Sequence, residues 1–226
     1  ISNLIENNLN KIIDVKSFNF SSVSSNHNQH IHRLLKHSNL KFDLVIFYGG
    51  YNETIQSFLY DPRPGYPFNY WIRNELSRIK YILLKYSAIY AEFEKQTGGL
   101  TNLNTIKDKI NFSKDVWYDD LFEKYFSTID NAKRLSEKFI RSNNCKSTKF
   151  VAFYQPISLK HSNESEKKII SETKKRLKLQ NNLIDLSQVI DENFFIDAVH
   201  VKQKAKKIIA AEISDYIKEN LLIDCN

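Results

Sequence analysis

Short apolar runs along the chain predict the strands of a parallel sheet. The clearest run extends from Leu44 to Tyr48, is apolar at every position, and stops at Gly49 and Gly50. A run without polar alternation is typical of a strand that is covered on both faces. Further strands are predicted at residues 15–20, 149–155 and 183–186.

Apolar positions spaced three or four residues apart predict helices between these strands. Because strands and helices alternate, the sequence predicts an α/β fold in which helices connect parallel strands. Helices are expected at residues 3–12, at residues 165–179 and after His200. Another is expected before Leu44, with Ile31, Leu34 and Leu35 as its buried positions.

The segment 54–148 is a long excursion between two of the predicted strands. It begins with three prolines within residues 60–67, which exclude regular structure there. Apolar stripes then predict long amphipathic helices at residues 72–93 and 122–139. The less patterned residues 97–117 fit either a lid or a loop, and the loop is the simpler interpretation. We therefore expect a helical insertion.

Composition indicates one globular domain. The 226 residues contain no linker rich in Pro, Gly or Ser, and aromatic residues make up 13% of the chain.

The net charge is +7 and includes a lysine cluster at residues 202–207. This cluster is interpreted as a solvated helix face, and the alternative is a site for an anionic surface or a polyanionic substrate. Basic and aromatic residues do not interleave as in RNA-binding modules, so nucleic acid is not an expected partner. No apolar run of about 18 residues predicts a membrane segment.

Four histidines, His27, His30, His32 and His37, lie close together before the run at Leu44. The step from His27 to His30 would place two imidazoles on one helix face. No acidic residue or cysteine accompanies them in this segment, so they are interpreted as surface histidines. Neither a metal nor another cofactor is expected.

Polar residues at the ends of the predicted strands are candidates for chemistry. Asn52 follows the Gly49-Gly50 pair, and Gln155 closes the strand 149–155. In open α/β sheets, active residues lie just past the carboxyl ends of strands. A structural Asn in a turn is the alternative interpretation of Asn52.

A second candidate is the pair Asp197 and His200, in a turn that leads into the last helix. An Asp three residues before a His can hold the Nδ1 proton of the imidazole, which leaves Nε2 free as a base. A helix cap or a surface turn is the alternative interpretation.

Three motifs, each attached to a fitting element, resemble those of the SGNH hydrolases, also called GDSL esterases and lipases. That family places an Asp-x-x-His just before its final helix, as Asp197 and His200 stand here. Its Gly-x-Asn-Asp motif is similar to Gly50-Tyr-Asn-Glu53, with Glu in place of Asp. Its Asn-Phe-Gly block is similar to Asn19-Phe-Ser21, with Ser in place of Gly.

The resemblance covers about residues 3–53 and 149–217. It implies a flavodoxin-like three-layer α/β/α fold with a parallel sheet, and a single SGNH-like domain over residues 1–226. The helical excursion 54–148 is not assigned by the resemblance and would be an insertion.

The resemblance also implies roles for individual residues. His200 would be the general base and Asp197 its orienting partner. The side chain of Asn52 would donate to the oxyanion, with the backbone N–H of Ser21 as the second donor of the oxyanion hole.

The nucleophile of the family is not found in this chain. The family's serine lies in Gly-Asp-Ser after the first strand, and the sequence contains neither Gly-Asp-Ser nor Gly-x-Ser-x-Gly. We therefore expect the first strand and the serine in a segment upstream of Ile1. In a flavodoxin-like strand order, that strand lies between residues 15–20 and 42–48, where we expect a gap or a direct pairing of its two neighbours.

The expected function is that of a serine hydrolase that cleaves ester bonds, such as the O-acyl esters of a carbohydrate, by a Ser-His-Asp mechanism. Residues 1–226 alone are expected to be inactive for lack of the serine. Two alternatives stay open. One is a related O-acyltransferase, and the other is a catalytically inactive carbohydrate-binding or scaffold protein that keeps the fold.

Overall fold

The computed structural model describes residues 1–21, 25–56, 87–96 and 116–221. Within these residues, a parallel sheet has the strand order β1-β2-β3. Three of the four predicted strands are thereby confirmed. The strands are β1 (Leu44–Gly49), β2 (Lys149–Tyr154) and β3 (Leu183–Asp185).

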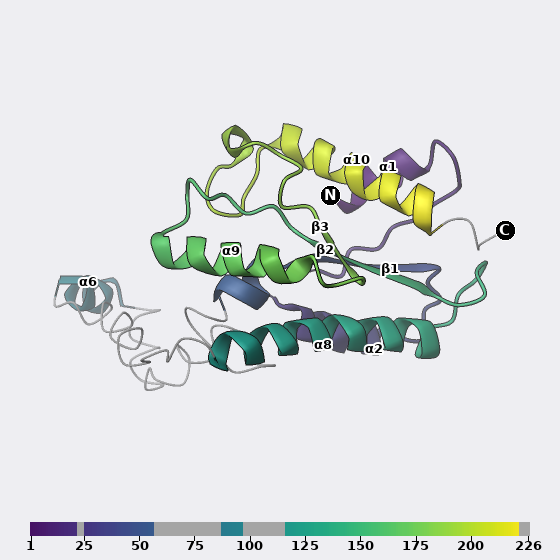
Figure 1. Cartoon of the computed structure of the whole chain (residues 1–226), viewed down its shortest axis with the longest axis horizontal. Coiled ribbons are helices and arrows are strands. Elements are labelled where there is room, and N and C mark those ends of the chain that lie inside the picture. Colours follow the sequence, from purple (N-terminus) through teal and green to yellow (C-terminus); the bar gives the residue numbers. More distant parts are fainter. Residues whose placement is uncertain (22–24, 57–86, 97–115, 222–226) are drawn as a thin grey trace.

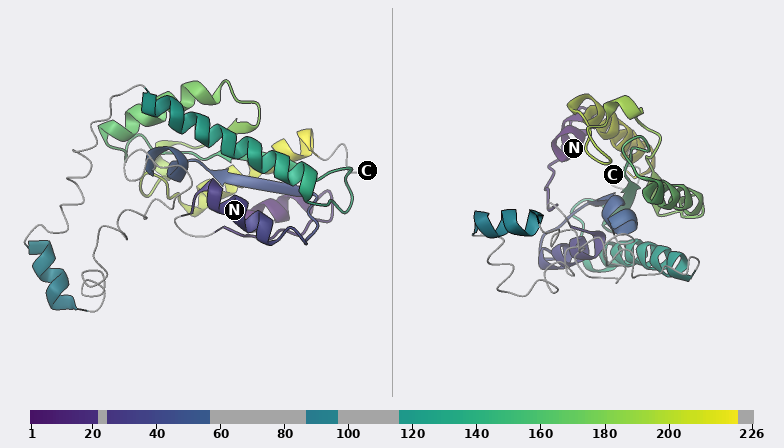
Figure 2. Two further views of the ribbon diagram at one scale, coloured as in Figure 1. Left: turned by 90° about the horizontal axis from the view of Figure 1, so that it is seen from below. Right: turned by 90° about the vertical axis from the view of Figure 1, so that its left-hand side faces the viewer.

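Helices cover both faces of this sheet. Figures 1 and 2 show α1 (Ser2–Leu9) and α10 (Gln203–Asn220) on one side, and α2 (His27–Lys36) and α8 (Val116–Phe139) on the other. α9 (Glu164–Leu177) contributes to the same core as α8. The structure is a mixed helix and sheet fold compatible with the predicted α/β class.

The alternation of side chains along β1 divides the core in two. Val45 and Phe47 pack with α8 and α9, whereas Leu44, Ile46 and Tyr48 face α1 and α10. The face of α10 toward the sheet is fully buried, as its apolar spacing predicts; it consists of Ala205, Ile209, Ala210, Ile213 and Ile217.

Local signals account for several helix boundaries. Asn26 and Gln29 form a capping box at the start of α2, and Asn163 and Glu166 form another at the start of α9.

The buried stripe predicted for α2 was one residue too wide. Leu34 is buried as expected, but Leu35 is exposed.

The insertion is described only in part. The predicted helix 122–139 is confirmed within α8, where Phe122, Tyr125 and Ile129 are buried. Most of the predicted helix 72–93 lies outside the described residues. Its end falls in α6 (Ala88–Gln96), where Phe93 is exposed and therefore not a core residue.

The predicted strand at residues 15–20 is wrong. The segment is extended but belongs to no sheet among the described residues. Contacts with neighbouring segments hold it: Glu6 accepts hydrogen bonds from the N–H and the hydroxyl of Ser17, and the rings of Phe18 and Phe20 stack on each other and contact Phe42. An extended chain becomes a strand only when a partner receives its backbone hydrogen bonds, and no described strand pairs with this segment. The flavodoxin-like strand order therefore stays a prediction.

Candidate active site

Two glycines end β1 and shape the turn that carries Asn52. Gly50 has a φ of +127°, and a Cβ atom there would lie 2.3 Å from the Tyr154 ring. A Cβ at Gly49 would lie 2.9 Å from Cε1 of His27. The glycines therefore allow the ring of Tyr154 and the imidazole of His27 to approach the backbone.

We expect Gly50→Ala to lower the free energy of unfolding by about 3 kcal/mol or more, because the strained φ and the overlap with Tyr154 each cost about 1–3 kcal/mol. Urea denaturation followed by circular dichroism measures the effect. Gly49→Ala separates the two causes and should cost less, because its φ is not positive and only the overlap with Cε1 of His27 remains. Equal stability of the Gly50 variant and the wild type would contradict the steric account.

The carboxylate of Glu53 joins this turn to the start of α2. Its Oε2 accepts the N–H of Gly50 at 2.8 Å, and its Oε1 accepts the backbone N–H of His27 at 2.6 Å. The same Oε1 lies 2.5 Å from Nδ1 of His27. Both side chains are buried, so Glu53 fixes two segments that are 26 residues apart in the sequence.

The protonation of Glu53 follows from these contacts. Burial opposes ionisation of the carboxyl group, but the charge of His27 and the hydrogen bonds outweigh it, so the pKa of Glu53 is lowered.

The imidazole of His27 is buried beside the ring of Tyr125, with 5.8 Å between the two ring centroids. Nε2 of His27 and the hydroxyl of Tyr125 have no hydrogen-bond partner among the described residues. The interpretation of His27 as a surface histidine was wrong.

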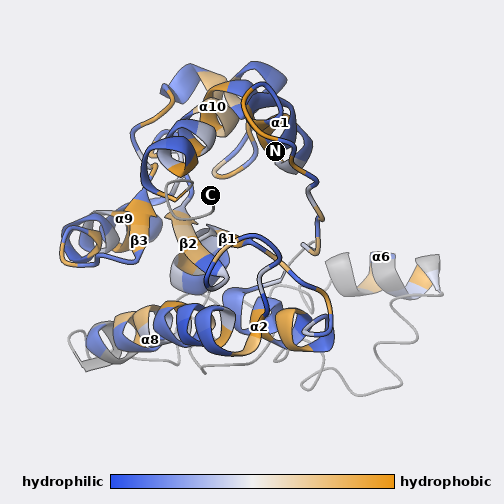
Figure 3. Cartoon of the chain, turned by 90° about the vertical axis from the view of Figure 1, so that its right-hand side faces the viewer, coloured by the Kyte–Doolittle hydropathy of each residue, from blue (hydrophilic) through white to orange (hydrophobic). Residues whose placement is uncertain are grey.

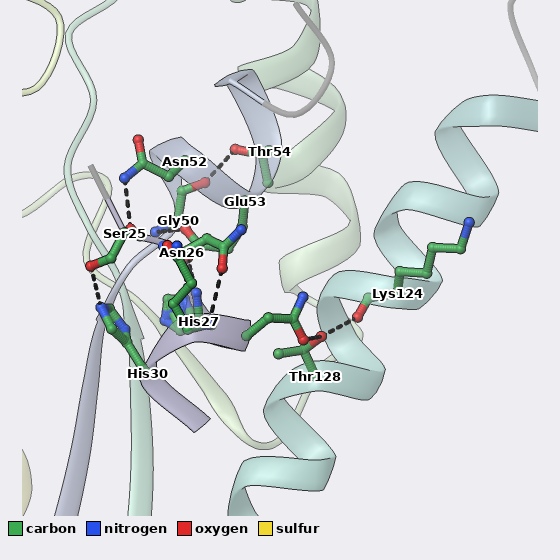
Figure 4. Close-up of polar contacts among 12 residues, drawn as sticks. Ser25, Asn26, His27, His30, Gly50, Asn52, Glu53, Thr54, Lys124 and Thr128 are labelled. Atoms are coloured by element: carbon green, nitrogen blue, oxygen red, sulfur yellow. Dashed lines mark hydrogen bonds and ion pairs between the residues drawn. The ribbon is translucent and has the colours of Figure 1, made fainter. Parts of the chain in front are cut away.

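Asn52 begins a π-helical turn (Asn52–Gln56) and points back toward the start of α2 (Figure 4). Its Nδ2 donates to the carbonyl of Ser25 at 2.8 Å. The hydroxyl of Ser25 lies 2.9 Å from Nε2 of His30, whose pKa is lowered to about 4 by burial and by the charge of His27. The imidazole of His30 is therefore neutral at neutral pH, and it is half-buried and not fully exposed as predicted.

Asp197 and His200 contact each other as the sequence suggests. Oδ2 of Asp197 lies 2.7 Å from Nδ1 of His200, and Oδ1 accepts the backbone N–H groups of Val199 and His200 at 2.9 and 2.8 Å. Burial opposes ionisation, but these hydrogen bonds and the charge of His200 together outweigh it and lower the pKa of Asp197 to about 2. The side chain of His200 is 75% exposed, so a substrate can reach its Nε2.

Asn52 and His200 lie at the same edge of the sheet. Asn52 follows β1, and the N–H of Gln155, just past β2, donates to the carbonyl of Gly49 at 2.7 Å. The N–H of Ser158, a little farther along, donates to the carbonyl of Ala198 at 2.9 Å. The turn that holds His200 therefore stands at the carboxyl ends of the strands.

The oxyanion hole is not assembled among the described residues. Nδ2 of Asn52 donates to the carbonyl of Ser25, while Nδ1 of His200 lies against Asp197. The N–H of Ser21 donates to Oδ1 of Asn19 at 3.0 Å, and its side chain is exposed. It is Ser25, four residues later, that lies beside Asn52.

Sequence reasoning missed the group formed by the buried His27 and Glu53 and the half-buried His30. The available signal was the acidic residue directly after Asn52, combined with histidines at the start of a helix that precedes the same strand. A pairing between them could not be derived from spacing, because it depends on how α2 packs against β1.

Comparisons with protein-family models, curated proteins and solved structures gave no match. In the part of the chain that the structure describes, no cluster of three or more His, Cys, Asp or Glu side chains is placed to hold a metal ion. No helix among the described residues is both long and apolar enough to cross a membrane.

Proposed function

We propose that this chain is part of a serine hydrolase of the SGNH type that cleaves ester bonds. The observation that carries the proposal is the Asp197–His200 pair, in which a carboxylate holds Nδ1 while Nε2 stays exposed at the carboxyl edge of a parallel sheet. An ionised Asp fixes the tautomer of the imidazole and stabilises the imidazolium that forms when Nε2 takes a proton.

In the proposed mechanism, Nε2 of His200 takes the proton of a serine hydroxyl as that oxygen attacks the ester carbonyl. The tetrahedral oxyanion then collapses to an acyl-enzyme, and the leaving alcohol receives the proton from His200. Water, activated by the same imidazole, releases the acid. The serine is proposed to lie in a segment before Ile1, because no Gly-Asp-Ser occurs in residues 1–226.

Asn52 is proposed to donate to the oxyanion, which requires its Nδ2 to turn from the carbonyl of Ser25. Because removal of one oxyanion donor costs about 2.7–4 kcal/mol of barrier, Asn52→Ala in the full-length protein should lower turnover of p-nitrophenyl acetate by two to three orders of magnitude. Asn220→Ala, at the exposed end of α10, is the control. An unchanged rate in the Asn52 variant would reject this role.

A non-catalytic carbohydrate-binding protein is the second candidate, and the hydrogen bond from Asn52 to Ser25 favours it, because a donor bound within the protein does not need an oxyanion. Calorimetric titration with acetylated oligosaccharides separates the candidates. Binding without release of acetate supports the second candidate. Release of acetate supports the hydrolase, and its appearance on an added sugar acceptor in place of water would indicate the related O-acyltransferase.

A further inference from the structure

The ends of α2, α8 and α9 form one face at the amino edge of the sheet, opposite the candidate active site. Each of these helices precedes a strand, so in a parallel sheet all three end at the same edge. Between the first two, the N–H of Phe42 donates to the carbonyl of Arg141 at 3.1 Å. Near the third, Nζ of Lys133 on α8 donates to Oδ1 of Asn182 at 2.8 Å. This surface, the amino-edge face, consists of residues 33–43, 134–149 and 177–182.

The amino-edge face is basic. Asp43 and Glu137 are the acidic residues in these three segments. Asp43 accepts hydrogen bonds from the loop 142–144, and Glu137 lies 4.0 Å from Nζ of Lys133, so groups of the protein itself already match both carboxylates. The exposed cations of the face make no ion pair with the described residues; they are Lys36, Lys41, Arg134, Lys138, Arg141, Lys146 and Lys178.

Exposed apolar side chains stand beside these cations. Four of them, between 38% and 79% exposed, each adjoin a lysine in the sequence: Leu35-Lys36, Leu40-Lys41, Lys138-Phe139 and Lys178-Leu179. The pairs come from three separate segments, and the fold brings them to one end of the molecule. In Figure 1 the junction of α8 with β2 lies on the right, and Figure 3 views the chain from that side, with hydrophobic and hydrophilic positions interspersed along α2 and α8.

We propose that the amino-edge face binds the surface of a lipid bilayer that contains anionic lipids. Apolar side chains that enter the boundary between headgroups and acyl chains add to the attraction between cations and anionic headgroups. A lysine next to each apolar residue suits this boundary, because its long side chain can reach the headgroups while its neighbour enters the apolar region. The net charge of +7 attracts the whole chain to the same surface.

The exposed leucines and phenylalanine favour a bilayer over a nucleic acid. Contacts with phosphates use cationic and hydrogen-bonding side chains and leave aliphatic groups without a role. Leu35, Leu40 and Leu179 are aliphatic, and a purely electrostatic partner does not require them.

Binding through this face sets the orientation of the candidate active site. β1 is six residues long, and a strand rises about 3.3 Å per residue, so the two edges of the sheet are roughly 20 Å apart. His200, at the carboxyl edge, then faces the aqueous phase and not the bilayer. The binding itself does not depend on the hydrolase activity.

Sedimentation of the full-length protein with lipid vesicles tests the proposal. The protein should bind vesicles of phosphatidylcholine mixed with phosphatidylglycerol, and bind vesicles of phosphatidylcholine alone at least about tenfold more weakly. Raising the salt concentration from about 0.1 M to about 1 M should weaken the binding, because it shortens the Debye length from about 10 Å to about 3 Å.

An apolar variant tests the side chains that enter the bilayer. It combines Leu35→Ser, Leu40→Ser and Phe139→Ser, and should bind the mixed vesicles at least about tenfold more weakly than the wild type. Leu159→Ser is the matched control, because Leu159 is an exposed leucine that precedes a lysine at the opposite, carboxyl edge. It should leave binding unchanged, and urea denaturation should show the same midpoint for all three proteins.

A charge variant tests the cations separately. It combines Lys36→Gln, Lys41→Gln and Lys138→Gln, and should bind the mixed vesicles on the order of 100-fold more weakly, since each lysine near an anionic surface contributes about fivefold. Lys160→Gln, at the carboxyl edge, is its control and should bind as the wild type does.

Several results would overturn the proposal. They are an absence of binding to the mixed vesicles, wild-type binding by the apolar or the charge variant, and binding to a DNA duplex without binding to vesicles. None of these measurements reads ester turnover, so this proposal and the proposed hydrolase can fail separately.

Discussion

His200→Gln in the full-length protein should lower ester turnover by about 10²–10⁴-fold, the usual contribution of a general base. Glutamine keeps a polar side chain but cannot take the proton of a serine. Because His200 is 75% exposed, and its contact with Asp197 lies at the surface, the variant should unfold at nearly the same urea concentration as the wild type. Steady-state hydrolysis of p-nitrophenyl acetate and urea denaturation measure the two effects.

The matched control for this variant is His32→Gln, which replaces an exposed histidine on α2. It should leave both turnover and stability unchanged. An equal loss of turnover in both variants, or a wild-type rate in the His200 variant, would contradict the role of His200 as the base.

Asp197 should keep its charge at every pH at which the site is assayed. Because its pKa is lowered from 3.8 to about 2, the carboxylate is ionised throughout the range in which esterases are assayed. The small stabilisation from the hydrogen bonds that it accepts, first of all from the backbone N–H groups of His200 and Val199, is present in full above pH 3.8 and is lost as the pH falls through about 2. If kcat/KM falls at a pH well above 2, the fall therefore reports the titration of another group and not of Asp197.

Glu53→Gln should lower the free energy of unfolding by about 3–5 kcal/mol, because removing one partner of a buried pair leaves the other without compensation. The amide of glutamine cannot accept from both Gly50 and His27 without turning its NH₂ group toward one of these donors. The exposed Glu123 on α8 supplies the control, since Glu123→Gln should change stability by less than about 0.5 kcal/mol. Urea denaturation at pH 7 measures both.

The effect of Glu53→Gln should also depend on pH. A carboxyl group whose pKa is lowered in the folded state stabilises the fold above its ordinary pKa of 4.5, and the stabilisation is lost as the pH falls through the folded-state pKa. The difference between wild type and variant should therefore shrink below pH 4.5. If the difference in unfolding free energy between wild type and Glu53→Gln stayed constant from pH 7 down to acid pH, the charge of Glu53 would not contribute and only its shape would matter.

Elements whose signals are local could be predicted from the sequence. β2 and α10 match the predicted ranges because a continuous apolar run and a stripe spaced by three and four residues report their burial directly. The contact of Asp197 with His200 was also accessible, since the two residues are three apart in one turn.

Elements that depend on distant partners could not be predicted in this way. Residues 15–20 have the composition of a strand, but a strand also requires a neighbour, and no described strand pairs with them. His27 and Glu53 are 26 residues apart, and only the packing of α2 on β1 brings them together. The hydrogen bond from Asn52 to Ser25 likewise depends on where the start of α2 lies.

Reaction of the full-length protein with a fluorophosphonate tests the central claim most directly, because this reagent phosphonylates a serine only when a neighbouring base activates it. The account predicts one adduct per chain, on a serine that precedes Ile1, and labelling that is at least about 100-fold slower in His200→Gln than in wild type or His32→Gln. An unlabelled wild-type protein, or labelling at the same rate in the His200 variant, would contradict the assignment of Asp197 and His200 as the catalytic pair of an ester hydrolase.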